Sequence, residues 1–86
     1  MDVPITQAIV DALKHVAHVP ESLQRRLDAI ARSGDGYVLK LTEDDAMALA
    51  ELAQWHIKSD PASGKPTPET APYDDLVRRL DEAQFG

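Results

Sequence analysis

The chain has 86 residues, contains no cysteine and carries a formal net charge of −6. This length fits a single domain spanning residues 1–86, and the lack of cysteine excludes disulfides and thiolate metal sites. The acidity argues against a nucleic acid or an anionic membrane as partner, because phosphate groups would be repelled.

Residues 6–18 are predicted to form an amphipathic helix. Thr6 is a suitable N-cap, since its hydroxyl can accept from a free amide of the first turn. At about 100° per residue, the apolar side chains fall on one face and Asp11, His15 and His18 on the other. Pro20 ends this helix, because the residue before a proline is pushed out of the helical conformation.

A second helix is expected over residues 20–33. Pro20 suits its first turn, and Gly34 suits the position just past its end. Glu21 and Arg25 stand at i and i+4, where opposite charges attract. Because the link between the first two helices is short, we expect them to pack as an antiparallel hairpin.

The segment 37–41 is the one strand predicted, from the sequence Tyr-Val-Leu-Lys-Leu. Tyr37 should share a face with the two leucines, and Val38 and Lys40 should lie on the other. A lone strand leaves backbone donors and acceptors unpaired. Three solutions remain open: residues 2–5 pair with it, a second copy of the chain pairs with it, or it is merely extended.

Residues 42–58 are predicted to form the central helix, because its apolar arc exceeds half the circumference. Thr42 is the N-cap, and Asp44 and Asp45 favour the positive end of the helix dipole. Met47 falls on the narrow polar side. Trp55 lies at the rim of the apolar arc, where the last helix covers it or a partner binds it; packing is the preferred interpretation.

A proline-bearing loop, residues 59–71, separates this helix from a last one over residues 72–83. Tyr73 belongs to the apolar face of that helix. The prediction is therefore a mainly α fold: a small four-helix domain made of a helical hairpin, one short strand, a central helix and a C-terminal helix.

Motifs for catalysis, metal binding or nucleotide binding are lacking. Asp11, His15 and His18 have a spacing that can hold a divalent ion, but nothing in the sequence supplies the supporting groups that a metal site needs. The four glycines do not form a phosphate-binding loop. We therefore expect no enzymatic activity, no metal and no cofactor.

These observations favour a non-enzymatic protein-interaction module, such as an adaptor, an inhibitor or a regulatory subunit. The N-terminus lacks a signal sequence and no apolar run approaches the ~20 residues of a membrane span, so we expect the cytoplasm. A protein partner is predicted, with a homodimer through strand 37–41 as one form of it. The candidate partner-binding residues are Trp55, Tyr37, Val38, Lys40, Asp44, Asp45 and Tyr73.

An alternative follows from the order strand, helix, loop, helix over residues 37–83. In topology alone this order resembles the ribbon-helix-helix repressors, in which two chains pair their strands. The resemblance implies a dimeric DNA-binding regulator. Lys40 is the only basic residue in the strand, however, and a groove-reading surface needs a basic footprint.

Overall fold

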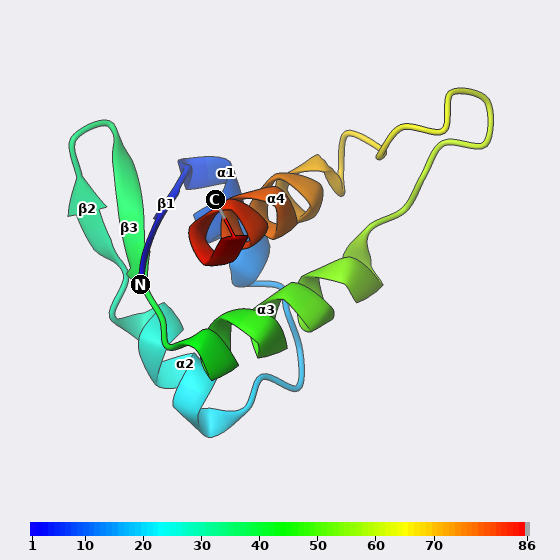
Figure 1. The fold of residues 1–86 in the computed structure, drawn as a ribbon. Coiled ribbons are helices and arrows are strands. Elements are labelled where there is room, and N and C mark those ends of the chain that lie inside the picture. Colours follow the sequence, from blue (N-terminus) through cyan, green and yellow to red (C-terminus); the bar gives the residue numbers. More distant parts are fainter. Residues whose placement is uncertain (86) are drawn as a thin grey trace.

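The computed structural model describes residues 1–85, which form four helices and a three-stranded antiparallel sheet (Figure 1). Helices make up 52% of the structure and strands 16%, so the predicted four-helix domain is wrong and the fold mixes helices with a sheet. One short strand lies before the first helix and matches one of the solutions left open for strand 37–41, the pairing with residues 2–5. The other short strand was missed by sequence reasoning and lies where the second helix was expected to end.

The sheet consists of β1 (Asp2–Ile5), β2 (Ala31–Ser33) and β3 (Gly36–Lys40), in the order β1-β3-β2. In β1 the burial alternates, with Val3 and Ile5 buried and Asp2 exposed. Val3 stands opposite Leu39 of β3, which is also fully buried. One face of the sheet therefore contributes to the core.

Strand β3 is central, and this settles the question of its partner. Residues 2–5 pair with one edge and residues 31–33 with the other. The same chain thus pairs with β3 on both edges, through β1 over residues 37–40 and through β2 over residues 36–38. Of the three solutions left open for this strand, the one formed within a single chain is therefore pairing with residues 2–5.

Strands β2 and β3 form a two-residue hairpin in which Ser33 stands opposite Gly36. Gly34 has φ 59°, as the first turn residue of such a hairpin requires. The prediction of a helix end at Gly34 was wrong, although the residue does adopt a positive φ. Residues 31–33 pair with β3, and this tertiary pairing overrides the helical pattern read from the sequence.

The first two helices are shorter than predicted and do not form a hairpin. Helix α1 spans Gln7–Leu13 and α2 spans Glu21–Asp28. His18, between them, has φ 59°, which no α-helix accommodates. The long connection lets α1 pack on α4 and β3, whereas α2 packs on α3 and β3. Thr6 is confirmed as the N-cap of α1.

The two remaining helices agree with the predicted ones within about two residues. Helix α3 spans Glu43–His56 and α4 spans Ala71–Phe85. Thr42 is confirmed as N-cap, since its hydroxyl accepts from the Asp45 amide at 3.1 Å. The helices pack side by side and run antiparallel, so that Gln84 near the end of α4 reaches the carbonyl oxygen of Glu43 at the start of α3 (Figure 1).

The segment between α3 and α4 extends away from the helices, at the right of Figure 1. Its base is closed by a bridge between Ser59 and Pro66 and by the buried hydroxyl of Thr70. That hydroxyl accepts from the Lys58 amide at 3.1 Å and lies 2.8 Å from the Thr67 hydroxyl. The loop is therefore fixed where it leaves the body of the protein.

The core gathers residues from every helix and from two strands. Its largest fully buried side chains are Val3, Ile9, Leu23, Leu39, Leu49, Leu76 and Leu80. Within residues 1–85, no helix combines the length and the apolar character needed to cross a membrane.

Candidate functional site

Three large hydrophobic side chains are strongly exposed on α3 and α4. Met47 is 64% exposed, and Trp55 and Phe85 are each 82% exposed. Trp55 is therefore not covered by the last helix, and the preferred interpretation of a packed tryptophan is wrong. A lone exposed hydrophobic needs no explanation, but neighbouring ones commonly mark a contact surface.

Helix geometry places Met47 and Trp55 on one ridge of α3. Met47, Glu51 and Trp55 follow one another at four-residue spacing, which aligns side chains along the outside of a helix. All three are exposed. The ridge therefore alternates an apolar, an acidic and an aromatic side chain.

A groove of about 560 Å³ lies between α3 and α4, and we call it the α3–α4 groove. Ala50 and Val77, both half-buried, contribute small apolar side chains to it, and the exposed Met47 and Phe85 contribute large ones. Its complete lining is Glu43, Met47, Ala50, Glu51, Gln54, Val77, Asp81, Gln84 and Phe85. Four apolar residues thus share the lining with five polar or acidic ones.

The charge of the groove has one sign. Glu43, Glu51 and Asp81 line it, and no lysine or arginine does so among residues 1–85. None of the ion pairs in this part of the chain uses these three carboxylates. A cation brought into the groove would therefore meet carboxylates that have no competing internal partner.

The predicted site residues of the strand lie away from this groove. Val38 and Lys40 lie on the sheet face opposite the core, where Val38 is half-buried and Lys40 is exposed. Tyr37 is half-buried, and its hydroxyl donates to the Gln7 side chain at 2.6 Å. Tyr37 is thus occupied by an internal hydrogen bond, and none of the three residues belongs to the lining of the groove.

The other candidates are divided between surface and core. Asp44 is exposed in the first turn of α3, whereas the Asp45 carboxylate pairs with Arg26 of α2 at 3.4 Å. Tyr73 is buried, stacks on His56 with ring centroids 5.0 Å apart, and donates its hydroxyl to the Ala12 carbonyl. Asp45 and Tyr73 therefore join elements of the fold. None of the seven candidates lines the groove, but Trp55 follows Met47 and Glu51 of its lining along the same ridge of α3.

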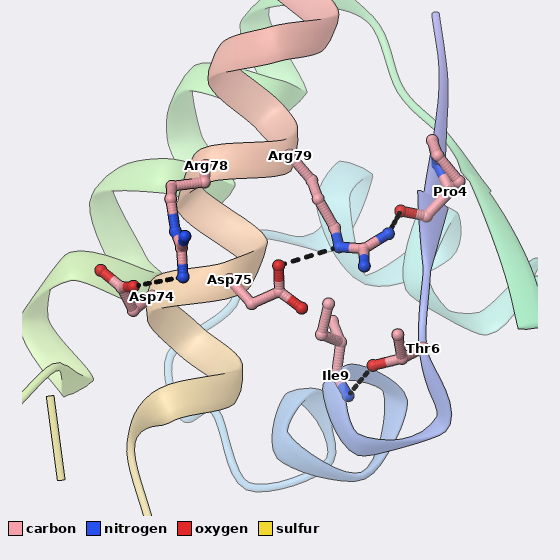
Figure 2. A network of polar contacts seen from close by, with 7 residues as sticks. All are labelled: Pro4, Thr6, Ile9, Asp74, Asp75, Arg78 and Arg79. Atoms are coloured by element: carbon pink, nitrogen blue, oxygen red, sulfur yellow. Dashed lines mark hydrogen bonds and ion pairs between the residues drawn. The ribbon is translucent and has the colours of Figure 1, made fainter. Parts of the chain in front are cut away.

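A second cavity, of about 450 Å³, lies between β1 and α4, and both of the arginines that line it are engaged in internal contacts. Arg79 donates to Asp75 and also to the carbonyl oxygen of Pro4 at 2.9 Å, while Arg78 pairs with Asp74 (Figure 2). Both helical pairs join residues four positions apart, the spacing at which side chains on a helix meet. This cluster ties the edge strand β1 to α4.

The polar face expected for the first helix is not formed as predicted. Asp11 belongs to α1, but His15 and His18 lie beyond its end at Leu13. Over the described part of the chain, no group of three or more histidine or acidic side chains is placed to hold a metal ion.

Sequence reasoning missed the two most useful groove residues. Phe85 lies beyond the predicted end of the last helix, which continues to that residue. Met47 was placed correctly on the polar side of its helix but was not interpreted further. A methionine between acids on a polar face was the available signal, because burial gives no reason for its presence there.

No protein-family model, no curated protein and no solved structure matches this chain.

Proposed function

We propose that this protein is a non-enzymatic interaction module that binds a protein partner through the α3–α4 groove and the adjoining ridge of Met47, Glu51 and Trp55. The observation that supports the proposal most is the exposure of Met47, Trp55 and Phe85 on two neighbouring helices. Aromatic and methionine side chains are enriched in protein interfaces and carry much of their binding energy.

Binding without catalysis accounts for the groove's composition. Its lining combines carboxylates and amides with apolar side chains, with no histidine, serine or threonine among the residues 1–85 that form it. Such a lining can exclude water from a docked side chain and pair with its charged neighbours.

We further propose a cytoplasmic location, supported by the composition of the chain, which has no cysteine.

Capture from the native host tests the proposal. Tagged full-length protein is compared with a Met47→Asp, Phe85→Asp double variant, which places charge into the groove. The control, Ala17→Asp with Ala62→Asp, adds the same charge at exposed positions elsewhere. We expect a partner that the parent protein and the control retain and the groove variant loses.

The captured protein is then purified and its affinity measured directly. A loss of at least about tenfold in affinity for the groove variant, against a change of less than about twofold for the control, is expected for residues at an interface centre. Equal binding by all three proteins would overturn the proposal, as would the absence of any host protein that distinguishes them.

A further inference from the structure

We infer that the occupant of the α3–α4 groove is an amphipathic helix that carries lysine or arginine beside its apolar stripe. This inference rests on the proposed function and specifies the chemistry of the partner. It follows from the shape of the groove and from the sign of its charge.

The shape of the groove fits a third helix docked between α3 and α4. Its walls are two antiparallel helices packed side by side, and Ala50 and Val77 between them are small enough for close approach. Along α3 the lining runs from Glu43 to Gln54, twelve residues, which span about 16 Å at the rise of an α-helix. That length matches about three turns of a docked helix with apolar anchors at i, i+3 or i+4, and i+7.

The charges specify what must flank those anchors. Glu43 and Glu51 lie two turns apart on α3, and Asp81 faces them from α4. Because ion pairs within residues 1–85 leave these carboxylates unused, basic side chains on either side of an apolar stripe can pair with them. An acidic helix with the same apolar stripe would be repelled.

The same charges argue against a second copy as the occupant. In a two-fold symmetric dimer, the same patch of both chains meets. Here the groove carboxylates of one chain would approach those of the other. The net charge of −6 adds to this repulsion.

A display selection on the full-length protein tests the inference. Random peptides of about four helical turns are selected on the parent protein and depleted on the Met47→Asp, Phe85→Asp variant. We expect the enriched peptides to carry a net positive charge and apolar residues at helical spacing. Their affinity should fall at least about tenfold when Glu51→Gln is combined with Asp81→Asn, because two charge pairs are removed.

Salt dependence and helicity give independent readouts. Binding of an enriched peptide should weaken as ionic strength rises, and the peptide should become helical in the complex by circular dichroism. Enrichment of acidic, neutral or extended peptides would overturn the inference, and so would a selection in which no peptide distinguishes the parent from the groove variant. A dimer in light scattering that dissociates on Met47→Asp would identify a second copy as the occupant and would also overturn it.

Failure of this inference is separable from failure of the proposed function. A host partner that requires Met47 and Phe85 but docks an acidic or extended segment would leave the interaction module standing and refute the basic helix. A host partner that binds equally well to the groove variant would refute both.

Discussion

At Gly36 the strands β1 and β3 approach so closely that a Cβ atom would lie 2.9 Å from the carbonyl oxygen of Ile5. The contact is with backbone, which cannot rotate away as a side chain can. Replacing Gly36 by alanine must therefore shift one strand relative to the other. The close approach arises because residues 2–5 pair with β3, which was one of the solutions that the sequence left open.

We predict that Gly36→Ala lowers the free energy of unfolding by about 1–3 kcal/mol, the usual cost of forcing an extra carbon into a packed site. Chemical denaturation followed by circular dichroism measures the change. Ser33→Ala, at the exposed register partner, serves as control and should change stability by less than about 0.5 kcal/mol. Equal stabilities for the two variants would contradict the tight strand contact.

Thr70 is the buried polar residue that closes the base of the loop. In Thr70→Val the Lys58 amide loses its acceptor, while the shape of the side chain is nearly kept. We predict that this variant has a free energy of unfolding lower by about 1–3 kcal/mol, because a donor at a partly buried site is left without a partner. Thermal unfolding of this variant is compared with that of Ser63→Ala at the exposed loop tip. An unchanged unfolding midpoint for Thr70→Val would contradict the stabilising role of the Thr70 hydroxyl at the base of the loop.

Trp55 and Leu49 lie on the same helix but have opposite environments. Leu49 is fully buried, whereas Trp55 is 82% exposed. We predict that the free energy of unfolding falls by about 2–5 kcal/mol in Leu49→Ala and by less than about 0.5 kcal/mol in Trp55→Ala. Denaturation followed by circular dichroism suits both variants. A large loss for Trp55→Ala would show that the side chain packs within the fold and would remove it from the binding surface.

At the scale of elements, α3 and α4 could be predicted, β1 was one of three open solutions for the partner of β3, and β2 could not be predicted. The two helices have long periodic patterns, an N-cap at Thr42, and the pairs from Asp74 to Arg78 and from Asp75 to Arg79. Strand β2 has only three residues, all exposed, so its pattern carries no signal of burial. Its conformation depends on pairing with β3, which is information from the tertiary structure.

Strand β1 owes its place partly to α4. Pro4 has no amide to donate at the sheet edge, and its carbonyl oxygen accepts from Arg79. We predict that Arg79→Gln lowers the free energy of unfolding by about 0.5–1.5 kcal/mol and speeds amide hydrogen exchange in β1. Both effects are expected because the hydrogen bond between strand and helix is lost.

The matched control for this change is Arg78→Gln. Arg78 makes an exposed pair with Asp74 within the same helix, and such pairs contribute little. Hydrogen exchange read by mass spectrometry should show faster exchange of β1 in the Arg79 variant alone. Identical exchange of β1 in both variants would mean that the contact with Pro4 does not hold the strand.

At the scale of the whole molecule, the acidity of the chain could be read from the sequence but its placement around a groove could not. The groove exists because α3 and α4 pack side by side after a loop of more than ten residues. No periodicity in either helix specifies that packing, so Met47 and Phe85 could not be recognised as neighbours of one groove. Trp55 was proposed from sequence because a rim position is visible in a single helix.

The docking surface is tested most directly by amide chemical-shift mapping of the full chain titrated with its captured partner. We predict that the largest shifts fall on residues 43–55 of α3 and 77–85 of α4. The sheet residues 31–40 and the loop residues 59–70 should change little. Largest shifts on the sheet or the loop, with α3 and α4 unperturbed, would contradict the assignment of the α3–α4 groove as the binding site.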